Sequence, residues 1–415
     1  MAAVWKKKSK PGLVIERIKK HASLNEKGAL TFVGFGFFEV EATLHSIIDY
    51  GEKISFQTKK SIRDRALREC LRAGALTAEL FIKQINKQIS LHKEVGEADY
   101  ALTTSVSVAG GLPLSRIVLP EATIVSYPAG LPKKYSGRGA FDEQWEELYG
   151  ANSPLPISYS AVVVKVRARS SSDAFDLAMS SLDFVRGIIG LNVNPPYQYS
   201  FLGGSSKPLN KVMLGGMHCL HHGNGRMAES NQFWYERHYS ERSPVDVGPK
   251  RKSVAKGCKF LINGLLKYPK DDVELIMSAV ARYANAYDEY DRDVLIQKLW
   301  AALESIAGGN ADAIVRRCSY LFWSREYELQ VLEYIRDYRN QNVHRGHSED
   351  ELDNHCFQLQ KFFRKLIIFY AGHSDFFQSL GEANRFLDFS DDKGKLEREI
   401  QLLEKAKSYR FSDER

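Results

Sequence analysis

The sequence lacks several features that would assign its class at once. Its 415 residues contain no run of about 18 apolar residues, so no membrane-spanning helix is expected. They also contain neither a GxxxxGK[ST] phosphate loop nor a strand–GxGxxG–helix unit, which gives no support to a nucleotide-hydrolysing fold. The five cysteines lie far apart and form no paired spacing, a pattern typical of reduced thiols in a cytoplasmic protein. No apolar run follows the early lysines at positions 6–8, so no secretory signal is expected.

The composition is that of a globular chain with more than one packed core. Apolar residues make up 44% and charged residues 26%, which excludes a disordered chain. The net charge of +7 is mild for this length and permits a nucleic-acid partner without requiring one. Basic residues concentrate in the first twenty positions and again at 250–259. On charge alone, a solvated tail and a solvated linker are the preferred interpretation of these two segments.

The first half of the chain predicts a mixed α+β region. Alternating apolar and polar residues in Tyr159–Ala168 predict a strand, and Ser171 is placed to cap a helix that runs to about Gly190. Helical spacing predicts a helix over Ser61–Ile89, weakened in its middle by Gly74. Further strands are expected at Leu30–Ala42 (a strand or bulged hairpin), Ala101–Val108, Ile117–Leu119 and Thr123–Tyr127.

The second half changes character after a loop-rich segment, 192–249. From about residue 255 onward helical periodicity dominates, and helices are expected near 271–283, 295–306, 311–323, 326–342, 349–372 and 376–387. We therefore predict an α+β fold with a boundary near residue 250. The expected parts are an α+β region at 1–250 with one or two subdomains, a helical bundle at 251–390, and a charged helix at 391–415.

One polar cluster falls where two of these helices meet. In the segment Arg339-Asn340-Gln341-Asn342-Val343-His344, Arg339 belongs to the last turn of one helix and His344 to the joint that follows. Ser348-Glu349-Asp350-Glu351 then forms a capping box for the next helix. Among 27 Arg and 11 His, an Arg followed by a His after four to six residues occurs about twice by chance. The spacing alone is therefore uninformative, and the prediction depends on the position of the two residues where one helix ends and the next begins.

This corner resembles the motif of the HEPN domain, a small helical bundle in which Arg and a polar residue, commonly Asn, precede a His. Asn340 matches that polar residue. The resemblance covers roughly residues 255–390. Within it, Leu299-Trp300-Ala301-Ala302-Leu303-Glu304 is similar to the "ALE" helix of Apea-like HEPN proteins, and the strand–helix unit 162–191 looks like the region that precedes the bundle in larger members.

The resemblance implies a metal-independent endoribonuclease without a cofactor, of the toxin or antiphage-effector kind, whose two motifs meet across a homodimer. An imidazole can move the protons of the 2′-hydroxyl and the leaving 5′-oxygen, and a guanidinium can stabilise the charge on the phosphate. His344 and Arg339 would take these roles, with Asn340 positioning the phosphate or the His. Glu304 would orient Arg339, or form an ordinary structural ion pair, and Arg336 and Arg345 would add phosphate contacts or remain exposed charges. The expected partners are RNA, a second copy, and a phage or cellular trigger sensed by the N-terminal region, with no membrane.

Three alternatives stay open at the level of sequence. The bundle is alternatively a non-catalytic HEPN module that binds or oligomerises in a larger defence complex. The cluster His218-Cys219-Leu220-His221-His222 suggests a metal site, but it completes no familiar zinc ligand set, and a His-rich local loop is the preferred interpretation. The stripe Leu396, Ile400 and Leu403 can dock on the bundle or on a partner.

Overall fold

The computed structural model describes residues 2–51, 54–150, 155–197, 207–229, 233–341 and 349–411. It has a mixed α/β N-terminal part and a helical C-terminal part, which confirms the α+β class. In the part of the chain that is described, no helix is both long and apolar enough to cross a bilayer.

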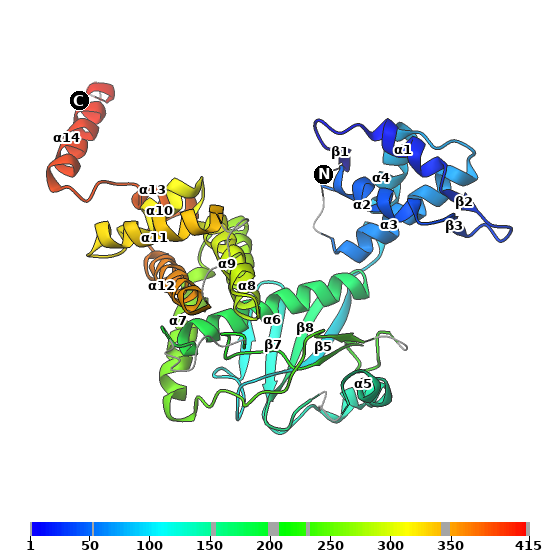
Figure 1. The fold of residues 1–415 in the computed structure, drawn as a ribbon, viewed down its shortest axis with the longest axis horizontal. Helices are drawn as coiled ribbons and strands as arrows, with labels where there is room; N and C mark the ends of the chain where they lie inside the picture. Colours follow the sequence, from blue (N-terminus) through cyan, green and yellow to red (C-terminus); the bar gives the residue numbers. More distant parts are fainter. Residues whose placement is uncertain are drawn as a thin grey trace.

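An N-terminal unit, residues 2–94, has a hydrophobic core of its own. Four helices build it: α1 (Pro11–Lys19), α2 (Gly36–Ser46), α3 (Phe56–Arg72) and α4 (Ala78–Glu94). Two antiparallel ribbons complete it, β1 (Val4–Trp5) with β4 (Ile48–Asp49), and β2 (Ala22–Leu24) with β3 (Leu30–Phe32). Buried apolar side chains such as Leu44, Leu67 and Phe81 fill the interior. In Figure 1 this unit, drawn in blue, stands apart from the other helices and touches α6.

Two predictions for this unit were wrong in part. The expected strand over Leu30–Ala42 ends at Phe32, and α2 begins at Gly36 after Gly34 turns the chain at a φ of +67°. The Phe and Val content suggested a strand, whereas Phe37, Val40 and Leu44 are buried at helical spacing.

The single helix expected over Ser61–Ile89 is two helices, α3 and α4. Gly74 adopts a φ of +65°, which ends α3, and the Thr77 hydroxyl then accepts a hydrogen bond from the Leu80 amide to cap α4. The glycine that weakened the predicted helix is therefore the point where the chain reverses.

A six-stranded antiparallel sheet follows, in the order β10-β9-β5-β8-β7-β6. Its strands are β5 (Ala98–Val106), β6 (Arg116–Val118), β7 (Ala122–Tyr127), β8 (Ser160–Ala168), β9 (Met217–His222) and β10 (Trp234–Tyr235). The predicted strands that correspond to β5 through β8 are confirmed. Alternation along β8 directs Val162 and Val164 toward α6 (Ser171–Val193), while Val163 packs with Tyr135 of the 3-10 helix η1 (Lys133–Phe141) on the other face. The short helix α5 (Asp142–Tyr149) follows η1.

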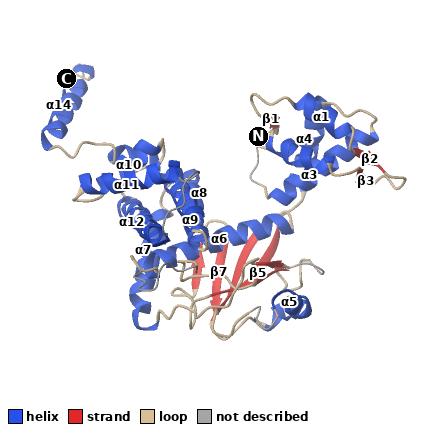
Figure 2. Ribbon diagram, viewed as in Figure 1, coloured by secondary structure: helices blue, strands red, loops and turns tan. Residues whose placement is uncertain are grey.

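The helix α6 runs across the strands in Figure 2 and packs against β5, β7 and β8. Its cap is Ser170, one residue before the predicted Ser171, and the Ser170 hydroxyl accepts a hydrogen bond from the Asp173 amide at 3.1 Å. Its C-terminal half is buried on all sides, because the sheet lies on one face and the helical bundle on the other.

The bundle contains α7 (Arg251–Leu265), α8 (Lys270–Tyr287), α9 (Arg292–Ala307), α10 (Ala311–Tyr320), α11 (Arg325–Gln341), α12 (Glu349–His373) and α13 (Leu380–Phe386), after the short 3-10 helix η2 (Gly248–Lys250). One hydrophobic core runs without interruption from the sheet through α6 into these helices. The contact of α6 with α8 is close enough that a Cβ added at Gly187 would lie 2.5 Å from the Val280 carbonyl oxygen. The change near residue 250 is thus one of secondary structure, with a shared core on both sides.

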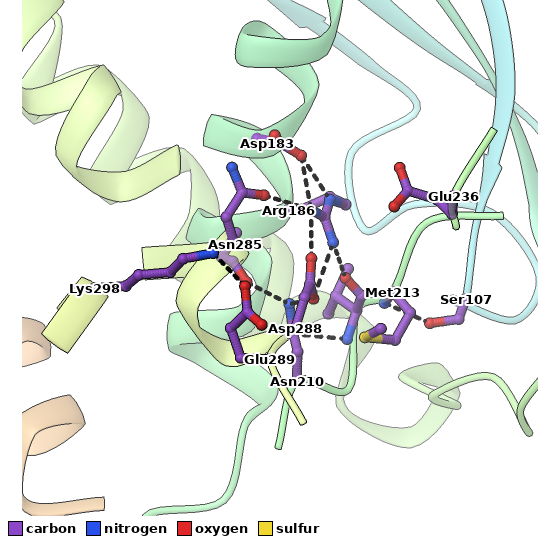
Figure 3. Close-up of polar contacts among 12 residues, drawn as sticks. Ser107, Asp183, Arg186, Asn210, Met213, Glu236, Asn285, Asp288, Glu289 and Lys298 are labelled. Carbon is purple, nitrogen blue, oxygen red and sulfur yellow. Dashed lines mark hydrogen bonds and ion pairs between the residues drawn. The ribbon is translucent and has the colours of Figure 1, made fainter. Parts of the chain in front are cut away.

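A buried polar network fastens α6 to the end of α8 (Figure 3). The fully buried Arg186 guanidinium donates to Asp183 Oδ1 at 2.7 Å, to Asp288 Oδ2 at 2.9 Å and to the Val212 carbonyl at 2.9 Å. Asn210 donates to Asp288 Oδ1 at 2.7 Å. Burial disfavours the charged guanidinium, but Asp288 and Asp183 outweigh it and raise the pKa of Arg186, so the cation is retained.

The N-terminal unit meets α6 through polar contacts at the start of that helix. Asp173 accepts a hydrogen bond from the Ser55 amide at 2.8 Å and lies 3.1 Å from the His92 ring. The Thr58 and Ser170 hydroxyls lie 3.0 Å apart. The joint between the two parts is therefore polar, and the N-terminal core stays separate from the main core.

The last helix, α14 (Lys393–Arg410), points away from the bundle in Figure 1 and has no buried residue. Ile400 is 55% and Leu403 68% exposed, so the predicted apolar stripe rests on nothing within the described chain.

We expect that ending the chain at Asp391 leaves the thermal midpoint within about 1 °C of the full-length value, because no packed side chain is lost. Differential scanning fluorimetry measures this. Ending the chain at Gln378 is the matched control, because it also removes α13 with the buried Leu380, Ala383 and Leu387, and should lower the midpoint clearly. A similar loss on removing α14 alone would show that its stripe packs against the protein or a second copy.

Candidate functional site at the end of α11

The apolar face of α11 determines where its polar end lies. Leu332, Ile335 and Tyr338 are buried against the bundle at helical spacing. The Tyr338 hydroxyl also donates a hydrogen bond to Asp293 Oδ1 on α9 at 2.6 Å. These contacts fix the last turn of α11 against α9, and the two residues that follow Tyr338 come to the rim of the bundle.

Arg339 lies half-buried over the ring of a tryptophan. Its guanidinium carbon is 5.5 Å from the ring centroid of Trp300 on α9. A cation over a tryptophan face contributes roughly 0.5–2 kcal/mol and orients the guanidinium plane without neutralising its charge. Trp300 itself is completely buried, and its Nε1 finds no acceptor among the residues that the structure describes. The Trp300 ring thus contacts Arg339 without using its hydrogen-bond donors.

The neighbouring arginines differ from Arg339 in being neutralised. Arg336, one turn earlier, pairs with Asp312 at 2.7 Å and with Glu333. Arg292 donates to Asp353 at 2.5 Å. In the described ranges, no carboxylate forms an ion pair with Arg339. Of these three cations, Arg339 is therefore the one that no described carboxylate neutralises.

The other predicted site residues fall into three groups. Asn340 is exposed at the end of α11, beside Arg339. Glu304 lies half-buried on α9, one turn after Trp300, and within the described part of the chain it forms no ion pair with Arg339. A phosphate contact by Arg336 would compete with its present carboxylate partners. His344 and Arg345 lie outside the described residues, which resume at Glu349, the predicted and observed start of α12.

Sequence reasoning missed the role of Trp300. The residue was visible within the "ALE" segment, but a tryptophan at an apolar helical position reads as core, and 0% exposure agrees. Its contact with Arg339 joins two helices 39 positions apart in sequence, so only the tertiary packing brings them together.

The His-rich cluster at 218–222 is not the loop that was predicted. It forms β9, a buried strand paired with β5. Strand alternation separates the rings: His218 lies near Phe175 of α6, whereas His221 packs on Tyr135 on the opposite face. The prediction failed because histidine carries no strand signal.

Each of these two rings has hydrogen-bond partners within the protein. His218 Nδ1 is 2.7 Å from the Thr104 hydroxyl, and its Nε2 is 3.1 Å from Glu236. His221 Nε2 is 3.2 Å from the Thr103 hydroxyl, and burial lowers the pKa of His221. Among the described residues, no three His, Cys, Asp or Glu side chains gather as metal ligands. All five cysteines are buried and unpaired.

Comparison with known proteins adds no family assignment. No family model matches the chain, and neither the curated proteins nor the solved structures contain a match.

Proposed function

We propose that this chain is a metal-independent endoribonuclease of the HEPN type, in which Arg339 and His344 carry the chemistry. The single observation that supports it most is the state of Arg339. This guanidinium is held over Trp300 at the joint before α12, while Arg336 and Arg292 beside it are neutralised by carboxylates. An arginine over an aromatic ring at the bundle rim, with no carboxylate partner among the described residues, is suited to a phosphodiester.

The proposed reaction uses the RNA's own nucleophile. The 2′-oxygen attacks the adjacent phosphorus, its proton passes to a basic imidazole, and the P–O5′ bond breaks. A protonated imidazole gives its proton to the departing 5′-oxygen. The Arg339 guanidinium stabilises the negative charge that accumulates on the phosphoryl oxygens, and the exposed Asn340 amide orients the phosphate. The products are a 2′,3′-cyclic phosphate and a 5′-hydroxyl.

The remaining parts of the proposal concern assembly and control. Two copies would place their α11–α12 joints face to face, so that acid and base can come from different protomers. The N-terminal unit would restrain the bundle or sense the trigger, as in a toxin or antiphage effector. Its separate core and polar joint to α6 are consistent with a part that changes position without unfolding the bundle.

The test is cleavage of a labelled oligoribonucleotide pool in EDTA, with analysis of the product ends. We expect cyclic phosphate and 5′-hydroxyl ends, and no cleavage of the same oligonucleotides carrying 2′-O-methyl groups. Cleavage that leaves 3′-hydroxyl ends, or that EDTA abolishes, would contradict the mechanism. Intact RNA in all conditions, including cell extract as a source of trigger, would favour the non-catalytic module.

A further inference from the structure

The N-terminal unit contains a cavity of about 340 Å³ that the nuclease proposal does not use. It lies where the β1–β4 ribbon, the end of α2 and the first turn of α3 meet. Lys6 follows β1, His45 comes from α2, Tyr50 follows β4, and Lys59 comes from α3. The volume is at the lower end of the range found for small-molecule sites.

Two polar atoms in the cavity wall are buried without partners. The hydroxyl of Tyr50, a residue only 4% exposed, forms no hydrogen bond in the described chain, and the same holds for His45 Nδ1. Outside the cavity lining, Nη1 of Arg63, a residue 1% exposed whose charge acts on both His45 and Tyr50, is also buried and unpaired within the described chain. Each such group costs about 1–3 kcal/mol when it is left unsatisfied, so three together in one small region indicate a missing acceptor.

The charges around the cavity favour an anion. Lys6 and Lys59 contribute ammonium groups to the wall, and Lys59 Nζ lies 5.7 Å from the centroid of the Tyr50 ring. Of the described carboxylates nearby, Glu41 and Asp64 accept from Arg63 Nη2 at 2.5 Å and 2.7 Å. Asp49, in the wall, accepts from the Gly51 amide at 3.0 Å and keeps its charge, so the two lysines leave the lining with a net positive charge. Residues 1–96 as a whole carry 18 Lys and Arg against 10 Asp and Glu, a balance of +8. The excess positive charge of the chain is therefore concentrated in this unit.

The protonation states of Tyr50 and His45 provide hydrogen-bond donors in the wall of the cavity. Burial raises the pKa of Tyr50 to about 12, so its hydroxyl keeps its proton at neutral pH. Burial lowers the pKa of His45, and Arg63, Lys59 and Lys6 lower it further against the opposing effect of Glu41. The neutral His45 ring can then present Nδ1 as a donor, and a bound anion would stabilise its protonated form.

We propose that this cavity binds the phosphate monoester of a small ligand. The donors come from different elements around the cavity, and a tetrahedral dianion offers more acceptor oxygens than a planar carboxylate. The cavity also has room for more than the phosphate, so a sugar-sized or nucleoside-sized group attached to it fits the volume. Lys59 follows the turn of α3 whose Ser55 and Thr58 contact the start of α6, so the ligand would sit next to the joint with the rest of the protein.

Isothermal titration calorimetry with the full-length protein tests the proposal. The probes are adenosine 5′-monophosphate, inorganic phosphate and adenosine. We expect saturable one-to-one binding of the monophosphate and none of adenosine. Binding of inorganic phosphate as tightly as the monophosphate would identify free phosphate as the ligand source. No saturable binding of either phosphate compound would overturn the proposal.

Point variants test whether the ligand binds in this cavity. Lys59→Gln and Tyr50→Phe should each weaken it on the order of tenfold, because each removes one donor to a charged ligand. Tyr50→Phe also removes an unsatisfied hydroxyl, so the fold should keep its stability. Lys87→Gln on α4 is the matched control, an exposed lysine of the same unit away from the cavity. Equal weakening in the control would show nonspecific charge attraction. Because RNA cleavage is not the readout, the result is independent of the proposed nuclease.

Discussion

His344→Ala is expected to reduce the rate of RNA cleavage by on the order of 10²–10⁴-fold, the usual contribution of a general acid–base catalyst. Arg339→Ala should lower it by about 10²–10³-fold, because the phosphoryl oxygens lose their oriented cation. Arg339→Lys keeps the charge and should recover only a part, since an ammonium group lacks the planar fork that matches a phosphate and packs on Trp300. The readout is the single-turnover rate in EDTA on the oligonucleotide that the wild-type protein cuts best.

Two matched variants separate chemistry from folding. His373→Ala removes an exposed histidine at the end of α12, outside the motif, and should leave the rate unchanged. Arg325→Gln removes an arginine at the start of α11, where it pairs with Asp391, and should also leave the rate unchanged. Full cleavage by His344→Ala, with a thermal midpoint like that of the wild type, would refute the assignment of His344.

Arg186→Met is expected to destabilise the protein by about 3–5 kcal/mol, the cost of leaving buried charges without their partner. Methionine fills a similar volume but leaves Asp183 and Asp288 without the guanidinium that they share (Figure 3). The measurement is the urea midpoint of the main core, followed by tryptophan fluorescence. The exposed pair of Lys298 with Glu289, close to the same network, provides the control, and Lys298→Met should change stability by less than about 1 kcal/mol.

The loss in Arg186→Met should depend on pH in a defined direction. Burial already raises the pKa of Asp288 against the lowering effect of Arg186, and loss of the guanidinium should raise it further above the unfolded value. Protonation then stabilises the folded variant at low pH, and this stabilisation is lost as the pH rises through the raised pKa. The difference in the free energy of unfolding between the variant and the wild type should therefore become smaller as the pH falls from 7 to 5. If the difference in the free energy of unfolding is constant over this range, lost packing, and not unpaired charge, causes the destabilisation.

The parts of the fold that were predicted correctly are those with a strong local signal. The alternating valines of β8 and the capped periodicity of α9 and α12 each specify their element within a short window. The errors occurred where local signals conflict. Aromatic residues in α2 resemble a strand, and β9 contains histidines whose burial depends on partners from β5.

The candidate site also combines features that have a local sequence signal with features that have none. Arg339 and Asn340 were predicted from a motif at a helix end, and both lie in the last described turn of α11, while their role stays a prediction. The support of Arg339 by Trp300 and the neutralisation of Arg336 by Asp312 involve residues of different helices. No spacing rule within one helix predicts such contacts, because they depend on how α9, α10 and α11 pack.

The length of α6 allows one helix to contact both the N-terminal unit and the helical bundle. Its 23 residues, at about 1.5 Å per residue, make a rod of roughly 34 Å. The N-terminal unit holds the first turn through Asp173, and the Arg186 network holds the far half. The far half lies between sheet and bundle, and the first half also packs on the sheet through Ala174 and Ala178, so the helix moves only as a unit with its surroundings. A displacement of the N-terminal unit would therefore act on a helix that reaches the bundle directly, where a Cβ added at Gly187 would meet the Val280 carbonyl oxygen of α8.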